Sequence, residues 1–351
     1  MSIERLANDA ISFKVKLRRP FRNTESRAGV LIQGPSGWGE FAPFPEYSND
    51  IAGRWLAAAL ESACGVWPTP VRTQVPVNAT IPAVTAEDAY QLTSDAVLNS
   101  GISTFKIKVG GQVTAGIHED LQRVVAVRAA AVSAGVEPRI RVDVNGAWTL
   151  SQAMDFLPQF NDVAEGLEYV EQPCSTLDEL RELKQRLDIR IAVDEGIRLA
   201  TDIQGTVVDG IDIRECADVM IVKSIPLGGV GQALRLIENI GLPVVVSGSL
   251  DTSVGLASGL ALAGCVEKLD GACGLGTGAL LAQDVVSDTQ APHLGVLSVA
   301  RISPDDQSLG VVTAQVSADE HEHWKQRMVS AWQSSAQYLV EPEVARMVQQ
   351  W

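Results

Sequence analysis

Histidines and paired cysteines are scarce in this sequence. Its 351 residues include four histidines, which lie away from the motifs described below. No two cysteines have CxxC spacing, and their positions are Cys64, Cys174, Cys216, Cys265 and Cys273. Scattered cysteines of odd number argue against a zinc site and against a disulfide framework. We therefore expect reduced thiols and a cytoplasmic location.

Basic residues are also in short supply. The chain has 28 Lys and Arg residues against 43 Asp and Glu residues, which gives a formal net charge of −15. An acidic protein repels phosphate backbones and anionic lipid head groups. We therefore expect no nucleic-acid partner and no membrane partner, and a small molecule as the ligand.

The sequence lacks a long apolar run free of polar residues. The most apolar stretch, residues 244–266, contains Asp251 and several serine, threonine and glycine residues. These residues favour a buried strand, a turn and a buried helix over a membrane span. The first 21 residues lack the apolar core of a signal peptide.

Short β-rich segments alternate with amphipathic helices from about residue 103 onward. The predicted strands lie near 104–109, 139–145, 167–173, 189–196, 218–225 and 243–249. Strands followed by helices at this spacing indicate parallel βαβ units, and about seven in succession favour a closed α/β barrel. The first hundred residues instead predict a small antiparallel sheet with helices.

A charged residue stands at the end of nearly every predicted barrel strand. These residues are Lys106, Lys108, Asp143, Glu171, Asp194 and Lys223. From Lys108 onward the intervals are 35, 28, 23 and 29 residues, each about one βα unit. Because active sites of such barrels form at the carboxyl ends of the strands, we expect these side chains to meet at one mouth.

The three carboxylates predict a site for a hard cation. Oxygen ligands without histidine or cysteine favour Mg²⁺, with Mn²⁺ as a possible substitute. The alternative is that Asp143, Glu171 and Asp194 cap helices or pair with arginines such as Arg141. All three carboxylates fall at the same place in successive βα units, which is improbable by chance and makes that alternative the weaker one.

Two of the lysines share one face of their strand. Lys106 and Lys108 are two residues apart, so both side chains point the same way. A lysine beside a second cation has its ammonium form disfavoured, which lowers its pKa and makes it a usable general base. The alternative is that these lysines only neutralise the carboxylates. A lysine base beside a hard cation suits removal of a proton α to a carboxylate.

Five short motifs carry a resemblance to a known family. They are K-x-K at 106–108, D-x-N at 143–145, E-Q-P at 171–173, D-E at 194–195 and the lysine of IVKSIPLGG at 223. In this order and spacing they resemble the enolase superfamily, in its muconate-lactonizing branch, whose sites are known to pair a lysine or histidine base with Mg²⁺. The resemblance implies a modified TIM barrel, (β/α)7β, with an α+β capping domain. Residues 1–98 would form the cap, 99–300 the barrel, and 301–351 a segment that packs back on the cap.

The resemblance also implies a role for each motif residue. Lys108 would be the base, with Lys106 tuning it and Lys223 stabilising the enediolate from the other face. Asn145 and Glu195 would support the metal site without binding the ion. The metal ligands would be Asp143, Glu171 and Asp194.

Two later stretches, 245–264 and 272–285, resemble the o-succinylbenzoate synthase group of that branch. That resemblance implies a syn dehydration of a succinyl-hydroxycyclohexadiene carboxylate. Ser247, Gly248 and Ser249 would offer backbone N–H groups and hydroxyls to the succinyl carboxylate. The alternative is a tight turn between strand and helix. An N-terminal loop would cover the mouth with Arg18, Arg19, Arg22 and Arg27.

Other functions stay open at this stage. The same lysines suit an N-succinylamino acid racemase, a dipeptide epimerase or a muconate cycloisomerase. A non-catalytic barrel has no need of opposed bases. The glycines at 228–231 resemble a dinucleotide fingerprint but come too late in the chain for one, and 271–278 lacks the Lys-Ser/Thr end of a P-loop. The oligomeric state is not predicted.

Overall fold

The N-terminal unit is an antiparallel sheet with helices packed on it. The computed structural model describes residues 3–21, 24–111, 117–200 and 203–350. The sheet has the order β1-β2-β3, as the sequence predicts for this region. The elements are α1 (Ile3–Asp9), β1 (Ile11–Phe21), β2 (Thr24–Gly34), β3 (Gly37–Phe41) and α2 (Asn49–Cys64).

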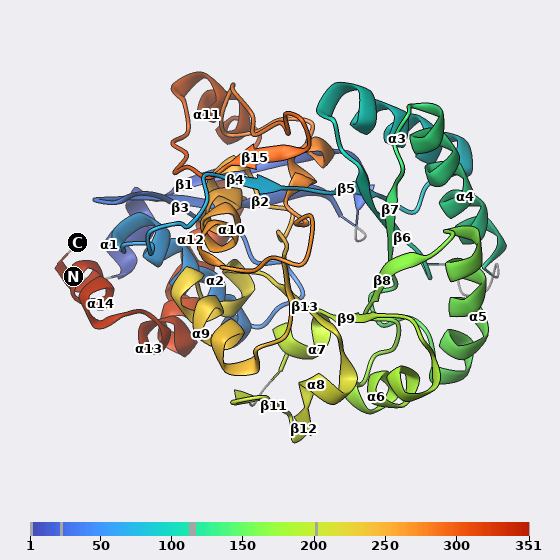
Figure 1. Cartoon of the computed structure of the whole chain (residues 1–351). Coiled ribbons are helices and arrows are strands. Elements are labelled where there is room, and N and C mark those ends of the chain that lie inside the picture. Colours follow the sequence, from blue (N-terminus) through green and yellow to red (C-terminus); the bar gives the residue numbers. More distant parts are fainter. Residues whose placement is uncertain (1–2, 22–23, 112–116, 201–202, 351) are drawn as a thin grey trace.

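C-terminal helices complete the core of this unit. Met328 and Val348 are buried in one cluster with Leu6, Trp55 and Leu56, so residues from both ends of the chain share one apolar core. Figure 1 shows the two ends of the described chain side by side, next to α1 and α14. The helices are α12 (Ala318–Ala331), a π-helical turn (Trp332–Ala336), α13 (Gln337–Leu339) and α14 (Pro342–Gln350).

The rest of the molecule is a parallel barrel, which confirms the predicted fold class. Its sheet has the order β14-β13-β9-β8-β7-β6-β5. Residues 269–274 close the ring, because Ser247 pairs with Gly274 on one side and Val77 pairs with Cys273 on the other. The strands are β5 (Ala79–Ile81), β6 (Thr104–Lys108), β7 (Arg139–Asp143), β8 (Leu167–Glu171), β9 (Ile191–Val193), β13 (Val219–Val222) and β14 (Val244–Val246).

Helices follow these strands along the outside of the barrel (Figure 1). Two of them begin with capping boxes, in which Thr149 pairs with Gln152 and Thr176 pairs with Glu179. The helices are α3 (Ala86–Ser100), α4 (His118–Ser133), α5 (Leu150–Val163), α6 (Leu177–Arg186), α9 (Val230–Ile240) and α10 (Ser253–Cys265). No helix in the described ranges has both the length and the apolar character needed to cross a membrane.

The segment between β9 and β13 contains both short helices and a small sheet. Short helices α7 (Glu195–Arg198) and α8 (Ile213–Cys216) flank a three-stranded meander. Its turns contain Gly205 and Asp209-Gly210, all with positive φ, and Asp-Gly is a strong hairpin signal. The meander strands are β10 (Ile203–Gln204), β11 (Val207–Val208) and β12 (Ile211–Asp212).

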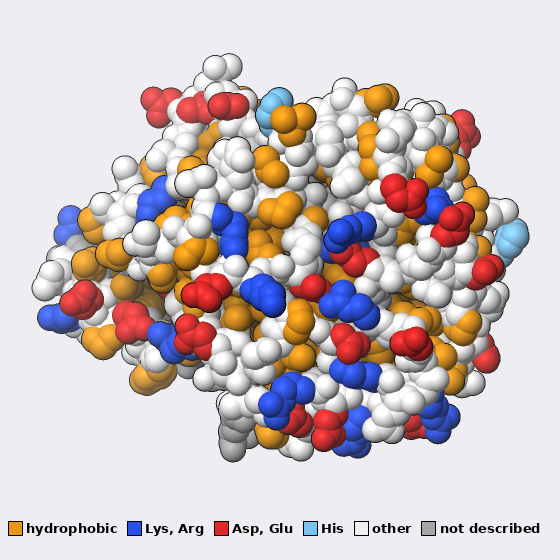
Figure 2. All heavy atoms as spheres, in the orientation of Figure 1, with side chains coloured by type: hydrophobic (Ala, Val, Ile, Leu, Met, Phe, Trp, Pro, Cys, Tyr) orange, Lys and Arg blue, Asp and Glu red, His pale blue; other side chains and the backbone are white. Residues whose placement is uncertain are grey.

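The remaining elements are short, and one of them, α11, packs against β1 of the N-terminal sheet. β4 (Gln74–Pro76) pairs antiparallel with β15 (Val296–Ser298). η2 (Ile225–Leu227), η3 (Gly276–Leu280) and α11 (Asp306–Thr313) complete the described chain. The division of domains at residues 98 and 300 stays a prediction, and the barrel strand β5 lies on its N-terminal side. On the face seen in Figure 2, acidic and basic side chains are intermingled.

Candidate active site

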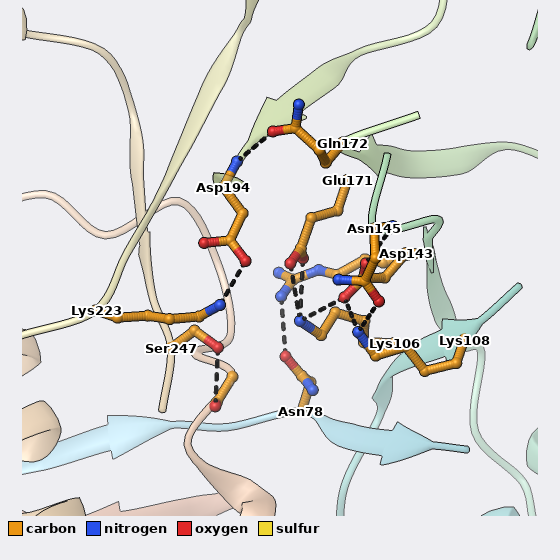
Figure 3. Close-up of polar contacts among 12 residues, drawn as sticks. Asn78, Lys106, Lys108, Asp143, Asn145, Glu171, Gln172, Asp194, Lys223 and Ser247 are labelled. Carbon is orange, nitrogen blue, oxygen red and sulfur yellow. Dashed lines mark hydrogen bonds and ion pairs between the residues drawn. The ribbon is translucent and has the colours of Figure 1, made fainter. Parts of the chain in front are cut away.

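The charged residues predicted from strand ends do meet at the mouth of the barrel. Strand register places Lys108 beside Asp143, and Asp143 beside Glu171, on three adjacent strands. Lys223 approaches from the opposite side of the cluster (Figure 3). Neighbouring parallel strands therefore bring together residues that are far apart in the sequence.

One half of the cluster is built on β6, β7 and β8. Lys106 Nζ lies 3.1 Å from both carboxylate oxygens of Glu171 and 3.1 Å from Asp143 Oδ2. Lys108 Nζ lies 2.5 Å from Asp143 Oδ2 and 2.8 Å from Asn145 Oδ1. Both lysines thus contact the same carboxylate oxygen, and Lys108 also contacts the amide predicted to support the site.

The other half is built on β9 and β13. Lys223 forms a hydrogen-bonded ion pair with Asp194 Oδ2, while Arg198 Nε donates to Asp194 Oδ1 at 3.2 Å. Arg198 also donates to Glu195 at 2.7 Å. Asn145 Nδ2 donates to the same Glu195 oxygen at 3.2 Å, so one amide links the two halves.

Asn145 and Gln172, which follow the ends of β7 and β8, both have left-handed backbone conformations. Asn145 has φ 51° and Gln172 has φ 41°, which bulky residues seldom adopt. In this conformation Gln172 Oε1 accepts hydrogen bonds at 3.1 Å from the backbone N–H groups of Asp194 and Gly196. Gln172, the middle residue of the E-Q-P motif, therefore orients the start of α7. The sequence analysis assigned it no role.

The three carboxylates are buried, each with 1% of its surface exposed. Burial raises the pKa of Glu171 to about 7, and repulsion from Asp143 adds to the effect. Burial also opposes the charge of Asp143, but Lys108 and Lys106 outweigh it and hold that pKa well below its usual range. Asp194 has a lowered pKa for the same reason, with Lys223 and Arg198 as the cations.

The buried lysines differ in their surroundings. Burial lowers the pKa of Lys223, and the single carboxylate of Asp194 only partly opposes that effect. Burial acts in the same direction on Lys106, but Glu171 and Asp143 together raise its pKa above its usual value. Lys106 is thus held as a cation, whereas the pKa of Lys223 lies below its usual value.

The donor set fits a hard divalent cation, although the carboxylates are engaged with lysines. Among the described residues, no three acidic, histidine or cysteine side chains form a ready-made metal-binding group. The fit rests on chemistry, since three buried carboxylates at one mouth offer only hard oxygen ligands. Asp143, Glu171 and Asp194 are the residues that would hold the ion.

One part of the structural alternative for these carboxylates is observed, since Asp194 pairs with Arg198, but the predicted pairing with Arg141 is not. Arg141 donates to Glu168 at 2.5 Å, to Asn78 at 3.2 Å and to the Ala272 carbonyl at 2.7 Å. Its hydrogen bonds therefore go to groups other than the three carboxylates. Asp194 precedes α7 but makes no side-chain capping bond to it.

Ser247, Gly248 and Ser249, the predicted substrate-binding residues, line the same pocket. Their backbone N–H groups, however, already donate within the protein, to Val222 O, Gly274 O and Asp251 Oδ2 respectively. The Ser247 hydroxyl also donates to Gly274 O, at 3.2 Å. This wall is therefore a hydrogen-bonded turn in the structure, and it is not an open nest of N–H donors.

Five further pocket residues were not predicted from the sequence: Phe44, Thr80, Leu250, Gly274 and Thr277. Only the first of these stands beside a sequence signal, the aromatic and proline-rich loop after β3. The others lie on a short strand, a turn, the segment 269–274 that closes the ring and a 3-10 helix. No sequence periodicity shows which residues of these short segments face the pocket.

The four arginines predicted to cover the mouth have different environments. Arg18 and Arg19 are exposed at the end of β1, where Arg19 pairs with Asp88 at 3.0 Å. Arg22 lies outside the described residues. Arg27 is instead buried and donates to the carbonyls of Leu250 and Ala42.

The glycine-rich stretch 228–231 leads into a helix N-terminus that is capped by a protein carboxylate and does not form a nucleotide site. Glu61 of α2 accepts hydrogen bonds from the N–H groups of Val230 at 2.6 Å and Gly231 at 2.9 Å. A carboxylate therefore occupies the helix N-terminus that a dinucleotide phosphate would need.

The chain matches two family descriptions. Residues 88–315 match the family described as Enolase C-terminal domain-like, and residues 12–63 match the one described as Enolase N-terminal domain-like. A muconate lactonizing enzyme from Pseudomonas fluorescens has the same fold, with TM-score 0.70 and 18% identity over 86% of this chain and 97% of that one. The L-Ala-D/L-Glu epimerase from Bacillus subtilis has TM-score 0.66 and 20% identity over 84% and 96%.

Curated relatives are more similar in sequence. The o-succinylbenzoate synthase of Thermobifida fusca is 45% identical, over 94% of this chain and 98% of the relative. The o-succinylbenzoate synthase of Mycobacterium tuberculosis is 41% identical, over 89% and 90%. The chain therefore belongs to the enolase superfamily, and within it to the family of these o-succinylbenzoate synthases.

Proposed function

We propose that this enzyme is an o-succinylbenzoate synthase. It dehydrates 2-succinyl-6-hydroxy-2,4-cyclohexadiene-1-carboxylate to o-succinylbenzoate, a step of menaquinone biosynthesis in the cytoplasm. The observation that carries the proposal is the placement of Lys108 and Lys223 on opposite sides of one pocket beside three buried carboxylates (Figure 3). The five cysteines are free, in keeping with a reducing compartment.

Lys108 acts as base and then as acid in this proposal. Its neutral amine takes the proton from the ring carbon that carries the carboxylate, and the C–H electron pair moves into the enediolate. Collapse of the enediolate breaks the C–O bond to the ring hydroxyl, and Lys108 returns its proton to that leaving group. The products are water and the aromatic ring, so no external oxidant or reductant is needed.

The other charged residues hold charge in place. The Lys223 ammonium would face the enediolate from the opposite side and stabilise it. Lys106, flanked by Glu171 and Asp143, is the fixed cation beside the base. Members of this family depend on a divalent metal, and we propose Mg²⁺ held by Asp143, Glu171 and Asp194. When bound, the ion would supply positive charge to the substrate carboxylate.

The test is an ultraviolet assay of the purified protein with the cyclohexadiene substrate. We expect the diene absorbance to fall when Mg²⁺ is present and to stay constant after EDTA is added. No loss of absorbance under either condition would contradict the proposal.

A racemase is the second candidate, because opposed lysines can each protonate one face of an α-carbon. Ser247, Gly248 and Ser249 are neutral and could not pair with a substrate ammonium group, which disfavours a dipeptide epimerase. Incubation of N-succinylamino acids in deuterium oxide tests this activity. Exchange of the α-proton faster than turnover of the cyclohexadiene would favour the racemase.

A further inference from the structure

The turn between β14 and α10, residues 247–252, is held from outside the barrel. Two buried ionisable residues of the N-terminal sheet reach it, Arg27 on β2 and Glu40 on β3, each with 3% of its surface exposed. Burying a polar or ionisable group is costly unless it is hydrogen-bonded. Their partners therefore show what these two residues do.

Arg27 connects two walls of the pocket. Its Nε donates to the Leu250 carbonyl at 3.1 Å, and its guanidinium lies 4.0 Å above the ring centre of Phe44. Both partners line the pocket. Leu250 has φ 64°, a left-handed conformation that is unfavourable for residues other than glycine. Arg27 thus contacts both the strained residue of the turn and the aromatic ring of Phe44.

Glu40 caps the helix that follows this turn. Its Oε2 accepts from the Thr252 N–H at 3.1 Å, from the Thr252 hydroxyl, and from the Gly255 N–H at 3.2 Å. Thr252 is the N-cap residue of α10, yet its own side chain makes no capping bond. The N-terminus of α10 is therefore capped by Glu40, a residue more than two hundred positions earlier in the chain.

Other carboxylates complete this N-terminus. Asp284 accepts from the Ser253 N–H at 3.0 Å and from its hydroxyl at 2.7 Å. Asp251 accepts from the Ser249 N–H at 2.7 Å, inside the pocket wall. Three buried carboxylates and one arginine thus surround the end of the turn, and only Glu40 and Arg27 come from the N-terminal unit.

We propose that Arg27 and Glu40 are positioning residues, which hold the 247–252 turn in the shape that binds the substrate. Selectivity for the substrate's side chain then depends on contact between the N-terminal unit and the barrel. This inference rests on the proposed function only for the identity of the substrate. The shape of the turn itself is measurable without turnover.

The matched control is Glu61, a second carboxylate of the N-terminal unit that caps a barrel helix. It accepts from Val230 and Gly231 at the start of α9, and neither of those residues lines the pocket. Glu61→Ala removes the same kind of cap from the neighbouring helix. Its effect should stay at residues 229–233.

The experiment is amide hydrogen exchange of the full chain, combined with steady-state kinetics. In Glu40→Ala we expect exchange at residues 249–256 to accelerate about tenfold or more, with no change at 104–108. KM should rise about tenfold while kcat stays within about threefold, because the residues that react are untouched. The affinity for Mg²⁺ measured by titration calorimetry should not change. Glu40→Gln keeps an acceptor oxygen and should restore most of the wild-type behaviour.

Arg27→Lys provides a second variant if Glu40→Ala does not fold. It keeps the charge but loses the planar group that bonds Leu250 and covers Phe44, so the same peptides should exchange faster. Unchanged exchange at 249–256 in these variants would overturn the inference, as would a fall in kcat at constant KM. Glu40→Gln behaving like Glu40→Ala would also overturn it.

The two proposals fail separately. If the wild-type protein does not turn over the cyclohexadiene, the proposed function fails. The exchange measurement still decides whether Arg27 and Glu40 hold the turn. Calorimetric titration with o-succinylbenzoate then replaces KM as the binding readout.

Discussion

The pocket has a charged half and a neutral half, and the two are built differently. The charged half comes entirely from consecutive barrel strands, and its lysines and carboxylates pair with one another. The neutral half comes from the loop after β3, from β5, from the turn after β14 and from η3. In the proposed mechanism the residues that react come from the barrel alone, whereas the wall proposed to bind the substrate is formed where separate units meet.

The largest expected effect is on the charged half. Lys108→Ala should lower kcat by about 10³-fold or more, because one group acts as both base and acid. The ultraviolet assay measures the loss, and circular dichroism with Mg²⁺ titration checks that fold and metal site remain. A rate near that of wild type would remove Lys108 as the base.

Lys223→Ala is the control for that assignment. A residue that only stabilises the enediolate should cost about 10²-fold to 10³-fold, less than the base itself. If Lys223→Ala loses more dehydration activity than Lys108→Ala, the two roles are reversed.

The contact between Glu40 and the start of α10 should respond to pH. Burial and repulsion from Asp251 raise the pKa of Glu40 to about 8, from an ordinary value of 4.5, with Arg27 and Asp284 as the other charged neighbours. The folded state therefore holds a proton that the unfolded chain releases. This contribution to stability is complete below pH 4.5 and is lost as pH rises through about 8.

Glu40→Gln removes that titration. Between about pH 5 and pH 9 the free energy of unfolding of the wild type should fall by a few kcal/mol more than that of the variant, at about 1.4 kcal/mol per pKa unit. Urea denaturation at several pH values measures the difference. Parallel curves for the two proteins would show that Glu40 does not titrate in this range.

Asp194→Asn should weaken binding of Mg²⁺ at least about tenfold, since one charged ligand becomes neutral. Calorimetric titration and the metal dependence of the assay both report it. Asp212→Asn, at an exposed ion pair with Arg214, is the matched control and should leave the affinity unchanged. Equal affinities for all three proteins would remove Asp194 from the metal site.

The smallest expected effect is on the neutral half. The Thr277 hydroxyl is buried and has no hydrogen-bond partner among the described residues. Thr277→Val removes that hydroxyl at nearly constant shape, so stability should be unchanged or up to about 1 kcal/mol higher. KM should rise about threefold if substrate completes the hydrogen bond. An unchanged KM would mean that substrate does not reach Thr277.

The sequence predicts the charged half because local rules place it. A strand alternates its faces every two residues, and each βα unit has a similar length, so Lys108, Asp143 and Glu171 recur in register. Gln172 falls outside these rules, since its backbone turns left-handed only in the folded site.

The neutral half could not be predicted from the sequence, because it is formed by contacts between residues that are far apart in the chain. Arg27 looks like one of several arginines near a loop, and only the packing of β2 against the turn at Leu250 shows that it is buried. Likewise, Glu40 and Thr252 are separated by 212 positions, and neither residue type signals the other. The barrel strand β5 is three residues long, too short for a pattern to identify.

Both the barrel and the N-terminal unit are completed by residues from late in the sequence, which has a consequence for folding during protein synthesis. The barrel ring is completed only by residues 269–274, and the core around Trp55 and Leu56 only by helices that contribute Met328 and Val348. While the ribosome is still making the chain, neither unit can bury its apolar surface fully. The nascent protein therefore exposes tryptophan and leucine side chains until the last helices emerge, and we expect it to bind chaperones during that interval.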